Sequence, residues 1–488
     1  MLSSFFVLAI PILFILVAIV SWFQPGIRPN LVKNLITYST IFGILLSGYC
    51  SYLVYNYGLL EIFLVDYQGL GISLRLDAVS VIMLTMISLL AFIIARFSLN
   101  YLDGDQRQGR FLGRLAATIS SVQFLVLAGN LLLLVLAWIL TSVALHRLLI
   151  FYFDRPGSLI AAKKKFVVAR LGDLSLIGAA ALIFNFFGTG NLEVIFQAIQ
   201  TDVLLAALPF ELECAAILLA FAAIFKSAQF PTHGWLIEVM ETPTPVSALL
   251  HAGLLNAGPF LIIRMAFLIE ASYYTPLLLI SIGGFTALFG SVVYLTQSSI
   301  KTALGFSSVA HMGFSLMVCG MGVFPAAMLH LVAHSFYKAH AFLSTGSVID
   351  TIRANKIKGI RKTGGFGKML LGIFLGAIIY TGFAFAWCID PVNEFSLLAI
   401  GAIIVLGLSR LFTSALDSGG SFALFGRASL LSLIVAISFF TLEEGMHLLM
   451  GKSIPALTMP STLGIVLISI VMALFILAVV LQMMAPSI

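Results

Sequence analysis

Long apolar stretches follow one another along almost the whole chain, and short polar segments separate them. Many stretches hold about eighteen or more residues with few charges, which is enough for an α-helix to cross ~30 Å of bilayer hydrocarbon. The pattern predicts an all-α, polytopic membrane protein with about 14–15 transmembrane helices. They are expected near 2–22, 31–57, 76–99, 111–128, 130–150, 166–187, 212–230, 243–268, 274–297, 302–322, 325–349, 369–388, 395–415, 421–441 and 462–486.

The amino-acid composition mainly excludes other classes of protein. Of the 488 residues, 61% are apolar and 9% are charged, whereas about a quarter of the residues of a soluble protein are charged. A soluble domain, a disordered protein and a nucleic-acid-binding protein are therefore excluded. We expect no cleavable signal peptide, because residues 1–22 have no basic segment before their apolar run. The connections are short, so chemistry on a large soluble substrate would need a partner protein.

The cysteines suggest neither a metal site nor a disulfide framework. They stand singly in apolar stretches, without the close spacing that either site requires. We therefore expect them to be small core residues. They are Cys50, Cys214, Cys319 and Cys388.

Charge gives the expected orientation, and in a polytopic protein the position of Lys and Arg matters more than the net charge of +6. Most of the 26 Lys and Arg residues fall in alternate connections, notably 96–114, 147–170 and 353–368. The connection 191–213 on the other side is acidic. By the positive-inside rule, the basic connections are cytoplasmic and the N-terminus lies outside. Two lysines, Lys226 and Lys338, fall inside predicted spans.

The first of these lysines precedes a proline in the segment FAAIFKSAQFPTHGWLIEVM. Pro231 removes a backbone donor five residues after Lys226, which predicts a break in the helix. A broken helix at membrane depth is tolerated only where it packs in protein or lines a wet cavity, so lysine plus break indicates an element of an ion pathway. The alternative is a lysine near a helix end that extends to the membrane surface.

Histidines supply the other candidate chemistry. His330, His334 and Lys338 are spaced i, i+4 and i+8 and so share an arc of about 80° on one helix, with His340 off that stripe. Imidazole titrates near neutral pH, and a desolvated lysine can exchange protons there too, so the stripe suits a proton relay. A polar seam between helices and a zinc site on His330 and His334 are the alternatives. Nothing like HExxH supports zinc. His251 stands alone and is either part of the relay or a hydrogen-bonded packing residue.

The stretch 226–253, KSAQFPTHGWLIEVMETPTPVSALLHAG, resembles the signature of the antiporter-like membrane subunits of respiratory complex I and of Mrp-type cation/proton antiporters. Further blocks agree in order and cover about residues 74–350. They are LRLDAVSVIMLTMIS at 74–88, GNLLLLVLAW at 129–138, RLGDLSLIG at 170–178, SSIKTALGFSSVAHMGFSLMVCG at 298–320 and HLVAHSFYKAHAFLSTGSVID at 330–350.

This resemblance implies two inverted repeats of five helices, each with a broken helix, at about 111–268 and 274–415, followed by C-terminal helices at 421–488. It also implies a chain of buried charges inside the membrane. Lys226, His251, His330, His334, Lys338 and Asp173 match the family's pathway, and we place Arg170, Glu238, Glu241 and Pro231 as supporting residues. The expected route carries a proton from outside through Lys338, His334 and His330 toward His251 and Lys226, with Asp173 tuning the lysine.

Two departures put an unaltered antiporter channel in doubt. The tryptophan of the GNLLLLVLAW block is usually followed by a glutamate, whereas here Ile139 follows Trp138. The span 369–388 has neither the family's second-repeat lysine nor its proline-rich break. We also expect no long lateral helix of the kind that subunit five of complex I uses as a clamp.

Three phrases resemble the DabB branch of the family, the membrane subunit of DAB-type inorganic-carbon accumulation systems. They are TSVALHRLLIFYFDRPGSLIAAKKKF at 141–166, HAGLLNAGPFLIIR at 251–264 and KAHAFLSTGS at 338–347. The branch implies a non-enzymatic transporter subunit in a bacterial inner membrane. It also implies a large DabA-like partner that holds a zinc site like that of a carbonic anhydrase, and no cofactor or metal in this chain.

Three functions therefore stay open. The first is ion translocation, by H⁺ or Na⁺, that drives uptake of CO₂ or bicarbonate. The second is a proton-pumping subunit of complex I or of an Mrp antiporter. The third is a non-conducting membrane anchor for a peripheral enzyme.

Overall fold

The computed structural model describes residues 2–152, 156–201, 208–239, 242–346, 366–387, 390, 394–417 and 422–484. Helix occupies each of the predicted apolar stretches. The helices are α1 (Leu2–Phe23), α2 (Asn30–Tyr57), α3 (Ala78–Tyr101), α4 (Gln108–Leu127), α5 (Leu131–Leu149), α6 (Pro156–Phe187), α7 (Leu192–Ile199), α9 (Phe210–Lys226), α10 (Gly234–Glu238), α11 (Thr244–Leu249), the π-helix η2 (Leu250–Leu254), α12 (Ala257–Arg264), α13 (Ala266–Ala271), α14 (Tyr274–Tyr294), α15 (Ile300–Gly320), α16 (Phe324–Leu343), α18 (Phe366–Ala386), α19 (Phe395–Asp417), α20 (Phe422–Met450) and α21 (Thr462–Met484).

Among the described residues, eleven helices are long and apolar enough to cross a membrane. Four of the fifteen predicted spans, 212–230, 325–349, 369–388 and 395–415, are helical but fall short of that measure, and two of them concern the site. Helix α9 has 17 residues because it ends at a break, and the apolar run of α16 is interrupted by three histidines and Lys338. The chain is a multi-pass, mostly helical membrane protein, as predicted.

A two-stranded hairpin was not predicted. Strands β1 (Leu60–Tyr67) and β2 (Leu70–Leu76) pair antiparallel, and the turn residues Gln68 and Gly69 have φ of 52° and 72°. Positive φ at both turn positions matches the twist of paired strands. A side chain at Gly69 would overlap Thr189, because the turn packs closely against the segment that leads into α7.

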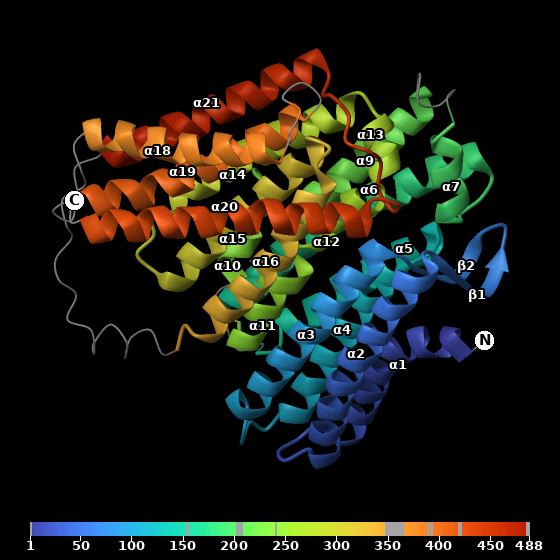
Figure 1. Cartoon of the computed structure of the whole chain (residues 1–488). Helices are drawn as coiled ribbons and strands as arrows, with labels where there is room; N and C mark the ends of the chain where they lie inside the picture. The colour runs from blue at the N-terminus through green and yellow to red at the C-terminus, as the bar shows by residue number, and fades with distance from the viewer. Residues whose placement is uncertain are drawn as a thin grey trace.

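The connections separate onto two faces, which we name by the hairpin. On the hairpin face, Arg75 of β2 pairs with Glu193 of α7, and Glu61 of β1 accepts a hydrogen bond from Asn191. On the opposite face, Lys33 pairs with Asp103 across the ends of α2 and α3. Figure 1 shows the hairpin, α7 and the N-terminus at one end of the long helices. The two sets of connections therefore alternate as the charge pattern requires.

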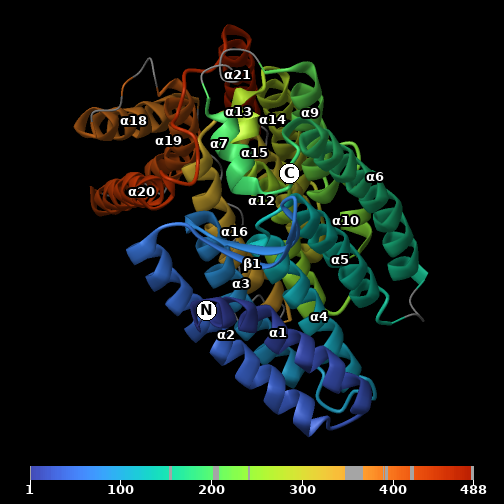
Figure 2. The same ribbon diagram turned by 90° about the vertical axis from the view of Figure 1, so that its right-hand side faces the viewer.

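The helices surround a fully enclosed element. Figure 2 shows α1 and α2 along one edge, α6 along another and α18, α19 and α20 along a third, with α12, α15 and α16 between them. The span Thr244–Arg264, formed by α11, η2 and α12, is entirely buried. The inverted relation of two repeats and their boundaries at 111–268 and 274–415 stay predictions. Cys50 and Cys319 are buried as expected, Cys214 is partly buried, and Cys388 lies outside the described residues.

Candidate functional site

The break predicted before Pro231 is present. Helix α9 ends at Lys226, and α10 begins at Gly234 after a turn in which Ala228 has φ of 52° and the Phe230–Pro231 peptide is cis. The free backbone N–H of Phe230 donates to the Thr286 hydroxyl of α14 at 3.2 Å. Neighbouring helices thus satisfy the backbone that the break releases, as a membrane interior requires.

Lys226, at the end of α9, is held by three polar atoms of α5. Its ammonium donates to the Thr141 and Ser142 hydroxyls at 2.8 Å each and to the Trp138 carbonyl at 3.1 Å. It also lies 4.4 Å from the centre of the Trp138 ring, a cation–π distance. Lys226 therefore points into the protein and does not extend to the membrane surface.

Charged groups of α6 surround this lysine. Arg170 and Asp173 form an ion pair at 2.6 Å, and Asp173 is buried and close enough to Lys226 for their opposite charges to attract. The sequence reading missed Lys165. It counted this residue with the basic loop before 166, but α6 begins at Pro156, and Lys165 is buried with its ammonium donating to the Ser142 carbonyl at 2.8 Å.

The supporting residue Glu238 lies farther toward the surface. Glu238, at the end of α10, pairs with Lys164, which is an exposed contact. Such exposed pairs contribute about 0–1 kcal/mol to stability. Glu241 lies outside the described residues.

His251 occupies a π-helical turn, η2, between α11 and α12. Its Nδ1 is 2.9 Å from the Ser308 hydroxyl of α15, and its ring stacks on Phe342 of α16 at 4.3 Å between centroids. Its Nε2 is buried without a hydrogen-bond partner among the described residues. Single π-turns inside membrane helices are frequent at functional sites.

Lys338 of α16 lies beside His251 and not beyond the other histidines. Its ammonium donates to the Ser307 hydroxyl at 2.7 Å and to the Leu304 carbonyl at 3.2 Å, and the side chain is fully buried. Ser307 adjoins Ser308, the partner of His251. Lys338 and His251 therefore contact adjacent serines of α15, and their charges are close enough to interact.

His330 and His334 meet a third histidine that the sequence reading did not select. His311 of α15 places Nδ1 3.3 Å from the His330 Nε2, and its ring centroid is 5.1 Å from that of His334. Both ring nitrogens of His334 lack partners among the described residues. His340 is exposed, as its place off the stripe predicts. Within the described chain, no group of three or more His, Cys, Asp or Glu is placed to hold a metal ion.

The buried polar groups form one row across the helices. It runs from Lys165 and Lys226 on α6 and α9, past His251 on η2, through Ser308 and Ser307 of α15 to Lys338 on α16, and on to the three histidines. A cavity of about 630 Å³ between α14, α15, α16 and α21 borders the histidine end, with His311 and His330 in its wall. The row passes from α6 and α9 to η2 and α15, and then follows α16 for two turns.

A buried ion-pair network on the hairpin face fixes the end of α12. Asp77 accepts from Arg75 at 2.8 Å and from Arg264 at 2.6 Å, and it caps α3 through the Ser80 N–H. Burial alone would raise the pKa of the Asp77 carboxyl, but the guanidinium groups of Arg264 and Arg75 outweigh it and hold this pKa well below its usual range. Hairpin, α3 and α12 are thus joined by charge.

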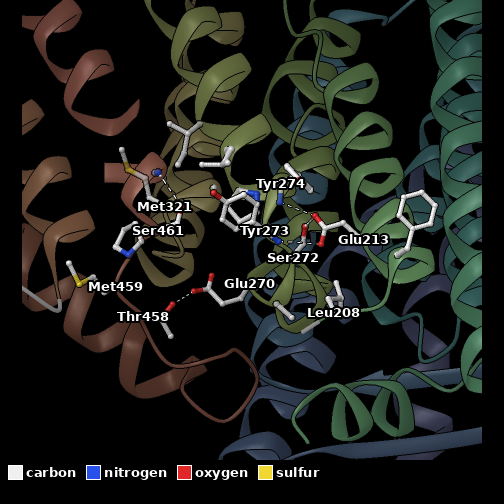
Figure 3. Close-up of a pocket in the computed structure, with 18 residues that line it drawn as sticks. Leu208, Glu213, Glu270, Ser272, Tyr273, Tyr274, Met321, Thr458, Met459 and Ser461 are labelled. Atoms are coloured by element: carbon white, nitrogen blue, oxygen red, sulfur yellow. Dashed lines mark hydrogen bonds between the residues drawn. The ribbon is translucent and has the colours of Figure 1, made fainter. Parts of the chain in front are cut away.

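A second cavity, of about 600 Å³, opens on the same face (Figure 3). Glu213 accepts from the Ser272 hydroxyl at 2.7 Å and from the Tyr274 N–H at 2.8 Å, which caps the start of α14. Glu270 faces Thr458 of the α20–α21 connection, and burial raises the pKa of the Glu270 carboxyl. Both carboxylates have structural partners.

Comparison with known proteins decides the family. The family described as NADH:quinone oxidoreductase/Mrp antiporter matches residues 128–384, more than half of the chain, and the N-terminal family of complex I chain 5 matches 65–112. A probable inorganic carbon transporter subunit DabB from Hydrogenovibrio crunogenus is 34% identical over 77% of this chain and 71% of its own length. The chain belongs to the antiporter-like membrane subunits, on the DabB branch.

Other relatives agree with that placement. The probable subunit DabB2 of Halothiobacillus neapolitanus is 40% identical over 72% of this chain and 63% of its own length, so the antiporter-like subunit described here spans less than two thirds of that relative. Among solved structures, the Mrp complex from Dietzia aligns with a TM-score of 0.67 at 23% identity over 98% of this chain and 56% of the Dietzia chain. The archaeal membrane-bound sulfane sulfur reductase aligns at 0.64 over 99% of this chain and 95% of its own. These structures support the fold.

Proposed function

We propose that this chain is the ion-translocating membrane subunit of a bacterial inorganic-carbon accumulation system, with protons as the ion. The observation that carries the proposal is the row of buried and half-buried Lys, His, Ser and Thr side chains from Lys226 to His330. Ionisable side chains inside a membrane are rare, because even one costs about 2.5–3.5 kcal/mol at the helix centre, and they mark ion pathways. Relatives named as inorganic carbon transporter subunits support the choice of cargo.

The energetics fit such coupling. A hundredfold accumulation of bicarbonate requires about 2.7 kcal/mol, and one charge that crosses 100 mV releases about 2.3 kcal/mol. One or two protons per turnover therefore suffice. In this proposal a proton from outside passes the histidines and Lys338, reaches His251 through Ser307 and Ser308, and continues to Lys226. Asp173 tunes Lys226 by its opposite charge.

The proposal includes location and partner. The basic connections face the cytoplasm and the N-terminus faces outward across the inner membrane. A large DabA-like partner holds zinc and converts CO₂ and bicarbonate, while this subunit supplies the ion flow and no catalysis. To test the partnership, tagged protein is isolated from gently solubilised native membranes and its companions are identified by mass spectrometry and metal analysis. We expect a stoichiometric zinc protein.

The second candidate is a complex I or Mrp subunit, which the shared family model favours. Two features weigh against it. Ile139 stands where the family usually has a glutamate, and α18 lacks the family's second-repeat lysine and proline-rich break. Recovery of NADH dehydrogenase or antiporter subunits in the same isolation would establish this candidate and overturn the carbon assignment.

Replacing Lys226 with alanine tests the row itself. We expect Lys226→Ala to abolish gradient-driven carbon accumulation, since no other group of α9 can carry the proton there, and to leave the complex assembled. Uptake of labelled inorganic carbon by cells measures the loss, and co-isolation of the partner measures assembly. Wild-type uptake in this variant would leave only the role of a non-conducting anchor.

A further inference from the structure

Lys165 differs from the two lysines that precede it. Lys163 and Lys164 are exposed on α6, whereas Lys165 is 5% exposed. A buried lysine in a membrane helix needs polar partners, and such residues mark ion pathways. Its ammonium donates a hydrogen bond to the Ser142 carbonyl of α5 at 2.8 Å. The lysine retains two further N–H donors for other groups.

Lys165 and Lys226 both bind Ser142. Lys226 donates to the Ser142 hydroxyl at 2.8 Å, while Lys165 donates to the carbonyl of that residue. The two cations are close enough to repel each other, and Asp173 and Arg170 are the other charged groups that act on Lys226. Like charges at this range disfavour simultaneous protonation of both amines.

A small cavity also joins the two lysines. It has a volume of about 20 Å³, and its wall includes Lys165, Lys226 and Thr141. About 10–15 Å³ is enough to hold one water molecule, provided that two or more polar groups bind it. Two amines and a hydroxyl supply those groups. The remaining wall, from Leu250 and Leu254 of η2 among others, is apolar.

On its other side Lys165 faces a group that reaches the surface. His146 lies one turn beyond Ser142 on α5, is partly exposed, and packs its ring against Phe166 at 5.5 Å. The charge of Lys165 acts on this imidazole, whose Nδ1 is buried without a hydrogen-bond partner among the described residues. The backbone carbonyl of the next residue, Arg147, accepts a hydrogen bond from the Arg114 guanidinium. Both residues belong to the basic connections of the face opposite the hairpin.

We propose that Lys165 is a second proton-transfer residue, which links Lys226 to His146 and to the basic face of the membrane. The inference rests on the proposed function, because it needs a proton at Lys226. The Lys226 ammonium exchanges one of its three hydrogen bonds for a water in the shared cavity and gives that water a proton. The water gives one of its own protons to the neutral Lys165 amine. Lys226 becomes neutral and Lys165 becomes charged, so one proton and one charge move together. Lys165 then returns to neutrality by passing the proton to His146.

The test compares substitutions at position 165 in the full complex, reconstituted in liposomes with a pH-sensitive dye inside. Lys165→Arg keeps a positive charge but does not release a proton, whereas Lys165→His can bind and release one. We expect the arginine variant to move protons at least about tenfold more slowly than wild type and the histidine variant to recover several-fold over arginine. Lys163→Met removes an exposed neighbouring charge and serves as the matched control, with wild-type rates.

Both variants at position 165 carry or can carry a cation, so the comparison between them does not depend on removing the charge. Wild-type rates in Lys165→Arg would overturn the proposal, because a fixed charge would then suffice. Equal rates in the arginine and histidine variants would overturn it as well. Absence of proton movement in the wild-type complex would instead contradict the proposed function, which separates the two failures.

Discussion

Two lysines of the row, Lys226 and Lys338, are held in different ways. Lys226 is partly buried and bonded to three atoms of α5, and it has Lys165, Arg170 and Asp173 as charged neighbours. Lys338 is fully buried and is held by one hydroxyl and one carbonyl, with no ion pair in the described part of the chain. One lysine lies among charges, and the other lies among neutral serines and imidazoles.

This difference shows what can control each ammonium. Charged groups on α6 act on Lys226 in addition to its burial, whereas Lys338 is buried against a hydroxyl and a carbonyl of α15. Changes of charge on α6 should therefore affect the first lysine, and changes of volume or polarity on α15 should affect the second. The two sites can be tested apart.

Of the three changes compared here, the largest effect is expected at Lys338, because the fewest neighbouring groups can replace it as a proton carrier. Lys338→Arg keeps the charge beside Ser307 but does not release it, because a guanidinium stays protonated in proteins. We expect proton transport in liposomes to fall about 100-fold, equivalent to about 2.7 kcal/mol. Lys452→Arg, at an exposed lysine, is the control. Transport within twofold of wild type would show that Lys338 is a fixed charge.

Asp173→Asn is expected to have an intermediate effect that is confined to the first site. It removes a carboxylate that acts on Lys226 and leaves Arg170 without its ion-pair partner, so the proton affinity of the lysine changes and transport should fall about tenfold. Dye quenching in liposomes measures the rate. Asp173→Glu should retain most activity, and Asp103→Asn, in an exposed ion pair, should be silent. Wild-type transport by Asp173→Asn would show that nearby charges do not control Lys226.

The smallest effect is expected in the histidine cluster. His311→Phe preserves ring packing but removes the nitrogen beside His330, while His330 and His334 remain to carry protons. Transport should fall about threefold to fivefold, within the range of a single acid–base contribution that is partly replaced. His340→Phe, on the exposed face of α16, is the control. A hundredfold loss at His311 would mean that the three imidazoles act as an obligatory chain.

The sequence predicted those features that depend on local order. Pro231 predicted the end of α9 near Lys226, because proline lacks the N–H that continues a helix. The 3.6-residue period placed His330, His334 and Lys338 on one buried face and His340 outside it. Helix positions followed from apolar length alone.

Features that depend on packing between distant segments were not predictable in the same way. A run of three lysines resembles a loop, and only the contact of α6 with α5 buries the third of them. His311 is a single histidine in its helix, and its partners come from α16. The hairpin carries apolar residues on both faces, so its strands lacked the alternation that identifies a half-buried strand. A glutamine–glycine turn was its one local signal.

The groups that hold the lysines have a consequence for the direction of flow. Serine and threonine hydroxyls each donate one hydrogen bond and accept others, and a neutral imidazole does the same through its two nitrogens. Such a row can be polarised with every bond pointing one way or with every bond reversed. Nothing in these groups acts as a rectifier, so the sign of the current in a path built on them is set by the forces at its two ends.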